Sequence, residues 1–323
     1  LGMCAYLAGV TQAPLTSAVI SLELTSSHTM LLPILAVCLL ARALSGLGGP
    51  AVTEPAVVAL GGGHGLHANL SALRLMSHRL TAVVTVADDG GSSGRLRSEM
   101  DVLPPGDLRM ALSALCDDSE WGHTWRDVLQ HRFRSSGPLD GHAVGNLLIV
   151  TLWELLGDPV AGLDWVGRLL GARGRVLPMA AVPLGIEADI EADGAVTTVR
   201  GQSRVAVAPG RLRRVRLVPT DPPACQEAVA AVREADWVIL GPGSWFTSVM
   251  PHLLVPELSA ALHETRARRC VTLNVSPFPR EEGNMTALEH LRALREHAPD
   301  LRIDVVLADP TAVDDVGAMA DEA

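Results

Sequence analysis

Lysine is missing from this 323-residue sequence, and all 26 basic residues are arginines. This absence excludes a Walker A phosphate loop, which needs a lysine, and it excludes Schiff-base chemistry. Aromatic residues make up only 3% of the chain, so Val, Leu, Ala and Ile must supply most of the core. The five cysteines are scattered without a C-x-x-C pair, which indicates reduced thiols and a cytoplasmic setting. The formal net charge of −10 argues against nucleic acid as a partner.

Charge is scarce in the first fifty residues, where Glu23 and Arg42 carry the only formal charges. Two apolar stretches, 13–24 and 30–44, are each shorter than the roughly 20 residues that cross a membrane as one helix. A charged n-region and a small-residue cleavage site are both missing, so we expect no signal peptide. We predict that residues 1–50 form a short apolar helical segment outside the main fold.

Residues 51–323 alternate short apolar runs with helical patterns, which predicts an α/β domain. We expect a Rossmann-like, mainly parallel sheet with helices on both faces. From residue 175 to 218 the hydrophobic period changes to two, which predicts an antiparallel β insertion. The expected strands are 57–60, 82–86, 237–240, 270–275 and 303–308, with 175–180, 184–191, 195–200 and 211–218 in the insertion. The expected helices are 108–115, 147–156, 159–171, 223–235, 256–265 and 286–297, with a further helix that begins at about residue 66.

Glycine-rich turns follow three of the predicted strands. Gly63-x-Gly65-x-x-Ala68, after the first strand, matches the dinucleotide fingerprint, which holds a diphosphate at a helix N-terminus. In AVVTVADDGGSSG (82–94), glycines let successive N–H groups converge on an anion and two serines add hydroxyl donors. This second glycine-rich turn is not part of the dinucleotide pattern and favours a phosphate-rich ligand over a nicotinamide. GPGSWFTS (241–248) follows a later strand. Because parallel sheets bind ligands at the carboxyl ends of their strands, we expect the three turns to share one crevice.

Two carboxylates, Asp88 and Asp89, stand between the second strand and its glycines. Asp88 lies twenty residues after Ala68, where Rossmann enzymes place the acid that binds ribose. Neighbouring carboxylates beside a diphosphate need a donor or a magnesium ion, so the pair is a candidate ribose or magnesium site. Replacing either residue by Asn should weaken binding at least about tenfold, unless both are ordinary turn residues. Asp107 is expected to cap the helix that begins at Leu108.

Five motifs in this order resemble the YvcK family of gluconeogenesis factors, which belongs with the CofD-type 2-phospho-lactate transferases. They are VVALGGGHGL (57–66), VVTVADDGGSSGRLR (83–97), PPGDLR (104–109), GHAVGNLL (141–148) and GPGSWFTSVMPHLL (241–254). The resemblance covers about residues 56–309. It implies a Rossmann-like fold and a cytoplasmic regulatory protein that binds a UDP-sugar such as UDP-N-acetylglucosamine. Roles in carbon metabolism and in cell-shape and cell-wall homeostasis are also implied, without an established reaction.

The resemblance leaves two alternatives open. CofD relatives bind a GMP-linked phospholactate and a deazaflavin with magnesium, so a magnesium-dependent transferase of this kind is one. GMCAYLAGVTQAPLTSAVISLELT and MLLPILAVCLLA, within residues 1–50, resemble part of the ClC chloride channel and transporter family. A membrane-anchored protein is therefore the other alternative. Separately, we expect that the chain can form a homo-oligomer. SPFPREEGNM (276–285) departs from the family's PGET-like stretch, and the chain looks shortened at its C-terminus.

The candidate site gathers the glycines, hydroxyls and carboxylates of these motifs. Its expected ligand-binding residues are Gly61, Gly62, Gly63, His64, Gly65, Leu66, Asp88, Asp89, Gly90, Gly91, Ser92, Ser93, Gly94, Arg95, Asp107, Asn146, Gly241, Gly243, Ser244, Thr247 and Ser248. Asp88 and Asp89 are the candidate magnesium ligands.

Overall fold

The computed structural model of the chain describes residues 54–192, 194–274, 285–309, 313 and 316–322. The predicted apolar segment 1–50 lies outside the described residues, and so does most of the 276–285 stretch. Within the part of the chain that is described, no helix is long and apolar enough to cross a membrane.

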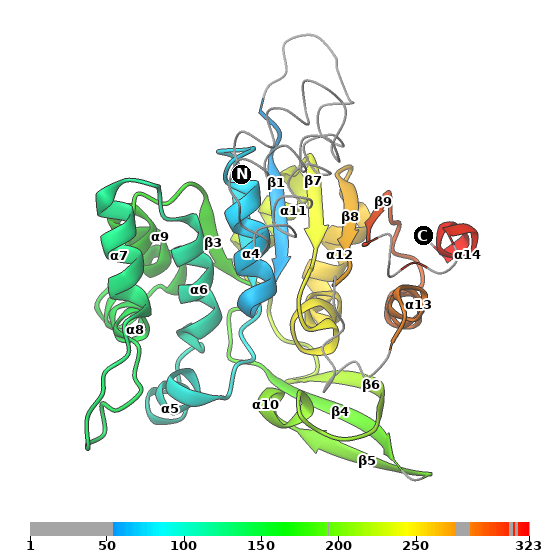
Figure 1. Cartoon of the computed structure of the whole chain (residues 1–323), viewed down its shortest axis with the longest axis horizontal. Coiled ribbons are helices and arrows are strands. Elements are labelled where there is room, and N and C mark those ends of the chain that lie inside the picture. The colour runs from blue at the N-terminus through cyan, green and yellow to red at the C-terminus, as the bar shows by residue number, and fades with distance from the viewer. Residues whose placement is uncertain (1–53, 193, 275–284, 310–312, 314–315, 323) are drawn as a thin grey trace, which may run out of the picture.

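Six parallel strands form the central sheet, in the order β3-β2-β1-β7-β8-β9 (Figure 1). Strands β2 and β3 are added on one side of β1, and β7, β8 and β9 are added on the other side, so β2 and β7 flank β1. Such a switch in strand order opens a crevice at the carboxyl ends of the neighbouring strands. The strands are β1 (Val57–Gly61), β2 (Leu80–Val84), β3 (Arg175–Pro178), β7 (Trp237–Leu240), β8 (Arg268–Thr272) and β9 (Val305–Leu307).

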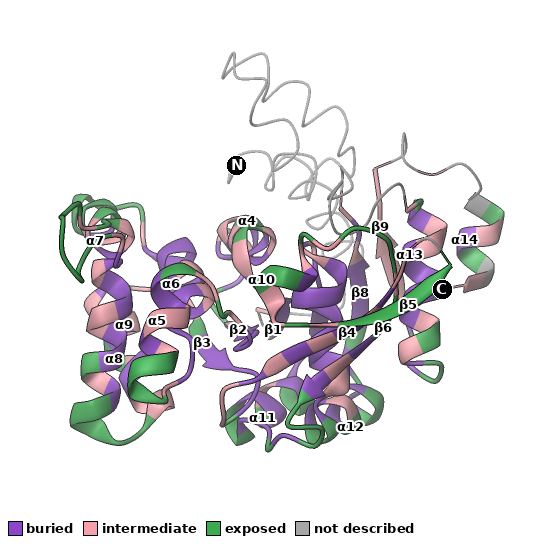
Figure 2. Ribbon diagram, turned by 90° about the horizontal axis from the view of Figure 1, so that it is seen from below, coloured by how far each residue is buried: buried purple, intermediate pink, exposed green. Residues whose placement is uncertain are grey.

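Helices cover both faces of this sheet, as Figure 2 shows, and the predicted α/β architecture is confirmed. Helices α4 (Gly63–Leu73) and α6 (Pro105–Leu115) lie on one face. Helices α11 (Gln226–Glu234) and α12 (Pro256–Glu264) lie on the other. The helices beyond the β3 edge are α7 (Glu120–Gln130), α8 (Val144–Leu156) and α9 (Pro159–Leu169), and those near β9 are α13 (Ala287–His297) and α14 (Val316–Glu322).

A second, antiparallel sheet of three strands, in the order β5-β4-β6, lies beyond the carboxyl ends of the parallel strands (Figure 1). It consists of β4 (Gly185–Ala192), β5 (Ala195–Arg200) and β6 (Arg211–Val218), and the short helix α10 (Gln202–Val205) lies beside it. Helix α5 (Gly91–Met100) lies next to α6. Burial alternates along β4, as expected for a strand with one solvated face. This confirms the predicted insertion.

One strand was assigned to the wrong sheet. The predicted insertion strand 175–180 is β3, which pairs in parallel with β2 at the edge of the central sheet. Three of its four residues are buried in succession, the pattern of a parallel strand covered on both faces. A period of two cannot be measured over so short a segment, which explains the error.

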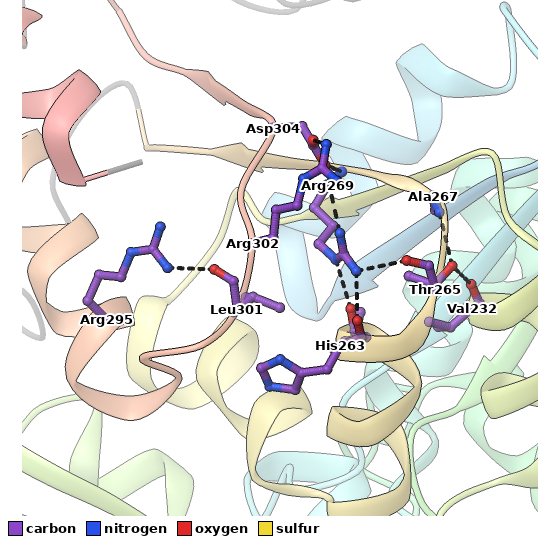
Figure 3. Close-up of polar contacts among 10 residues, drawn as sticks. Val232, His263, Thr265, Ala267, Arg269, Arg295, Leu301, Arg302 and Asp304 are labelled. Atoms are coloured by element: carbon purple, nitrogen blue, oxygen red, sulfur yellow. Dashed lines mark hydrogen bonds and ion pairs between the residues drawn. The ribbon is translucent and has the colours of Figure 1, made fainter.

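A buried arginine joins β8 to the end of α12, as Figure 3 shows. The Arg269 side chain donates hydrogen bonds to the carbonyl oxygens of Leu262, His263 and Thr265 at 2.7, 3.1 and 2.8 Å. Asp304 accepts the Arg269 backbone N–H at 2.9 Å. The last carbonyls of a helix have no partner within that helix, and a cation is favourable there. Arg269 thus attaches β8, the neighbour of the edge strand β9, to the end of α12.

Candidate functional site

Three strand ends meet at one cavity of about 290 Å³. The turns after β1, β2 and β7 all contribute to its lining, so the predicted common crevice is confirmed. Two larger hollows, of about 570 and 330 Å³, lie at the amino ends of β1 and β2 and beside α9. We assign the site to the smaller cavity because it lies where parallel sheets bind ligands. Its lining residues are Gly62, Gly63, His64, Gly65, Asp88, Asp107, Gln202, Ser203, Ala206, Ser244, Thr247 and Ser248.

The turn after β1 carries the N-terminus of α4 to the cavity. The helix begins at Gly63 rather than near Leu66. Its N-cap residue, Gly62, has no side chain that could cap the helix. Gly63 has a φ of +56°, which L side chains rarely adopt. A Cβ on Gly65 would lie 2.7 Å from the Gly243 nitrogen, so only glycine fits between the two turns. The helix therefore presents N–H groups and a positive dipole end to the cavity.

The glycine run after β2 is the first turn of α5 rather than an open loop, so the expected loop conformation is wrong. Gly90 is the N-cap residue, and Ser92 and Ser93 are buried inside the fold. The Ser92 hydroxyl accepts a hydrogen bond from Asn146 Nδ2 and contacts His142 Nδ1, both at 3.0 Å. Burial lowers the pKa of His142, which favours the neutral ring. These serines support the site from behind and do not line it.

Asn146 and Arg95 also bind protein groups rather than the cavity. Asn146 Oδ1 accepts a hydrogen bond from Arg109 Nε at 2.8 Å. The Arg95 guanidinium donates to the carbonyl oxygens of Pro138 and Asp140 at 3.1 and 2.6 Å. Both side chains thus hold the segment before α8 against α5.

The turn after β7 leads into a π-helix, η2 (Trp245–Val249), and then a 3-10 helix, η3 (Met250–Leu254). Two asparagines that the motifs did not single out fix this turn. Asn274 accepts a hydrogen bond from the Gly243 N–H at 2.9 Å and donates to its carbonyl oxygen at 2.8 Å. Asn69 donates to the Gly241 carbonyl oxygen at 2.9 Å. Short π-helices are frequent at functional sites, and this one presents the Ser244, Thr247 and Ser248 residues to the cavity.

Thr85, buried directly after β2, connects the first and third turns. Its hydroxyl lies 3.1 Å from the Gly61 carbonyl oxygen and 3.0 Å from that of Ser248. Its one sequence signal is a polar residue inside the apolar run AVVTVA.

The adjacent aspartates point to different partners. Asp88 lines the cavity, and its Oδ1 accepts a hydrogen bond from the Gly90 N–H at 2.9 Å. Asp89 is exposed, and its Oδ1 accepts from the Ser203 N–H on α10, also at 2.9 Å. Successive residues of an extended segment face opposite ways, so the structure separates the predicted magnesium pair.

Asp107 is the carboxylate that faces Asp88. Helix α6 begins at Pro105 with Pro104 as its N-cap residue, so the expected capping role of Asp107 is wrong. The Asp107 side chain instead accepts a hydrogen bond from the Gly63 backbone N–H. Burial, and then the charge of Asp88, raise the pKa of Asp107 to about 7. A carboxyl group that is hard to ionise can hold its proton at neutral pH, or it can bind a cation together with a neighbouring carboxylate.

Residues 57–322 match the family model described as 2-phospho-L-lactate transferase CofD. The chain belongs to the CofD family, within its gluconeogenesis-factor (YvcK) branch. A candidate gluconeogenesis factor of Mycobacterium tuberculosis is 57% identical over 261 residues, which are 80% of this chain and 76% of that protein. The Bacillus subtilis gluconeogenesis factor is 38% identical over 262 residues, or 81% of each chain.

A solved structure shows the same fold. The crystal structure of a Bacillus halodurans protein is similar with a TM-score of 0.74 and 37% identity, covering 84% of this chain and 86% of that one. Residues 1–46 match a separate model, described as voltage gated chloride channel.

In this CofD-family chain the predicted residues divide into two groups. Those that line the cavity are Gly62, Gly63, His64, Gly65, Asp88, Asp107, Ser244, Thr247 and Ser248. Those that are not in the lining are Gly61, Leu66, Asp89, Gly90, Gly91, Ser92, Ser93, Gly94, Arg95, Asn146, Gly241 and Gly243. Gln202, Ser203 and Ala206 line it and were not predicted, because the polar stretch between two insertion strands carries no motif.

Proposed function

We propose that this chain is a cytoplasmic regulatory protein that binds a UDP-sugar, such as UDP-N-acetylglucosamine, in the cavity. The supporting observation is that the N-terminus of α4, whose N-cap residue Gly62 offers no side-chain cap, faces the Asp88 carboxylate and the η2 hydroxyls across one cavity. A helix N-terminus with glycine neighbours favours a diphosphate, and a carboxylate accepts hydrogen bonds from ribose hydroxyls. The gluconeogenesis-factor relatives support a role in carbon metabolism, and we extend the proposal to cell-shape homeostasis.

Magnesium fits the Asp88–Asp107 pair. Mg²⁺ prefers oxygen ligands and is often held by one or two carboxylates together with phosphate oxygens and water. Within the described residues no cluster of three or more His, Cys, Asp or Glu side chains forms a cage for a metal. The remaining ligands would therefore come from the bound diphosphate and water. When bound, the ion would neutralise the repulsion between the two carboxylates and the phosphates.

A CofD-like transferase of a nucleotide-linked phospholactate group is the second candidate. The family model and the Asp107 carboxyl favour it. A pKa of about 7 suits a group that holds or releases a proton at neutral pH. The Arg109 guanidinium donates hydrogen bonds to the side chains of Asn146 and Gln130. These bonds give Arg109 a structural role, so we do not assign it to the transferred group.

Calorimetric titration of the full chain tests the proposal. UDP-N-acetylglucosamine, UDP and NAD are titrated with and without Mg²⁺, and we expect the UDP-sugar to bind more tightly than NAD. Asp88→Asn should weaken UDP-sugar binding by about ten- to a hundredfold, because a hydrogen bond to a charged group is lost. Asp140→Asn, outside the cavity, is the matched control. Tighter binding of NAD would refute the proposal, whereas turnover of a nucleotide-linked phospholactate, followed by phosphorus NMR, would favour the transferase.

A further inference from the structure

One wall of the cavity comes from a different part of the fold. Gln202, Ser203 and Ala206 lie on or directly after α10, between β5 and β6 of the antiparallel sheet. Every other lining residue belongs to a turn of the parallel sheet or to the first turn of α6. Figure 1 shows α10 beyond the carboxyl ends of the strands, on the side where the antiparallel sheet lies. The α10 wall can therefore contact a part of the ligand that the glycine turns do not reach.

Asp89 holds this wall in place. Its Oδ1 accepts a hydrogen bond from the Ser203 N–H at 2.9 Å, and so satisfies a donor in the first turn of α10. Gly201 has a φ of +96°, and a Cβ there would collide with Asp89 Oδ2. The Gly201 N–H donates to the Ile186 carbonyl oxygen of β4 at 2.8 Å. Two anchors thus determine where α10 lies, one in the segment after β2 and one on β4.

The wall offers polar groups that the protein does not use fully. Gln202 Nε2 lies 3.5 Å from the Thr247 carbonyl oxygen, the outer limit of a hydrogen bond. Gln202 Oε1 has no hydrogen-bond partner among the described residues, and the Ser203 side chain is exposed. Side-chain amides and hydroxyls both donate and accept, which matches the hydroxyl groups of a sugar.

We propose that the α10 wall recognises the sugar part of the ligand, with Gln202 as a specificity-determining residue and Asp89 as its positioning residue. The inference rests on the proposed function, in which the helix N-terminus and the η2 hydroxyls hold the diphosphate. The amide of Gln202 would then exchange its long contact with Thr247 for hydrogen bonds to sugar hydroxyls.

Paired titrations of the full chain with UDP and with UDP-N-acetylglucosamine test this assignment. Gln202→Leu keeps the side-chain size and removes the amide, so UDP-sugar affinity should fall roughly tenfold while UDP affinity stays within about twofold. Gln226→Leu, on α11 and outside the lining, should change neither affinity. Equal losses for both ligands, or no loss for either, would overturn the assignment.

Two variants of Asp89 test the positioning role. Asp89→Ala removes the acceptor for the Ser203 N–H and should weaken UDP-sugar binding roughly three- to thirtyfold, again sparing UDP. Asp89→Asn keeps a carbonyl acceptor, so its affinity should stay within about threefold of the wild type. This expectation replaces the roughly tenfold loss that the sequence alone predicted for Asp89, because Asp89 lies outside the cavity lining. A loss for Asp89→Asn as large as that for Asp89→Ala contradicts positioning by this hydrogen bond. Thermal melting checks that each variant is folded. Failure of the wild type to bind UDP would refute the proposed function itself rather than the assignment of the α10 wall.

Discussion

Replacing Asp107 by asparagine should stabilise the protein at high pH and weaken its site. The pKa of Asp107 rises from 3.8 in a free carboxyl group to about 7 in the folded chain. Between these pH values the folded state binds more protons than the unfolded state, so the free energy of unfolding falls as pH rises from about 4 to 7. Asparagine carries no such proton and removes this loss.

The magnitude follows from the pKa change. A pKa that rises from 3.8 to about 7 corresponds to about 4 kcal/mol of stability lost above pH 7. Asp107 is half-buried rather than fully enclosed, so water screens part of this cost and we expect about 2 kcal/mol. The amide oxygen of asparagine can still accept the hydrogen bond from the Gly63 N–H, so little is lost in exchange.

Urea unfolding of the wild type and of Asp107→Asn at pH 5 and pH 8 measures the effect. The gain in the variant should be about 2 kcal/mol at pH 8 and clearly smaller at pH 5, where the loss of stability has already begun. The pH dependence due to His252 must be separated from that of Asp107. Burial lowers the pKa of His252 to about 4, which makes the free energy of unfolding rise with pH between about 4 and 6.5. His252 is present in both proteins, so its contribution cancels in the difference. Equal gains at the two pH values, or a loss at pH 8, would refute the reasoning about the carboxylate pair.

Two further substitutions separate the site from the scaffold. Gly65→Ala places a Cβ 2.7 Å from the Gly243 nitrogen, so calorimetry should show at least a roughly tenfold loss of UDP-sugar affinity. Gly137→Ala is the control and should leave the affinity unchanged, because a Cβ there meets nothing within 4 Å. Arg269→Met leaves three carbonyl oxygens without their donors, so urea unfolding should show a loss of about 3 kcal/mol with unchanged ligand affinity. Arg302→Met, at an exposed position nearby, is its control, and a large effect there or none at Arg269 would count against this role.

The sequence predicted those features that depend on local patterns. Runs such as 57–60 and 237–240 are strands because continuous apolar segments of this length are buried on both faces. The capping box at Thr286 also begins α13 as expected, because both of its hydrogen bonds are local. The shared crevice followed from the rule for parallel strands.

The remaining features depend on contacts between distant segments. The opposite directions of Asp88 and Asp89 are set by α6 on one side and α10 on the other. The capping prediction for Asp107 failed because the Gly63 N–H, 44 positions earlier in the chain, offers this carboxylate a partner. Gln202 could not be singled out, since its importance comes only from the cavity that it borders.

The bridging hydroxyl of Thr85 has a thermodynamic consequence for association. Together with the Asn274 bonds to Gly243, it sets the spacing of the two anion-facing turns before any ligand arrives. Ordering of loops and side chains is one of the main entropic costs of binding, and a rigid host avoids most of it. The ligand must then adapt to a fixed distance between two sets of donors. A diphosphate that matches this distance binds without reorganisation of the turns. A shorter or longer anion must leave the hydrogen-bond donors of one turn without an acceptor.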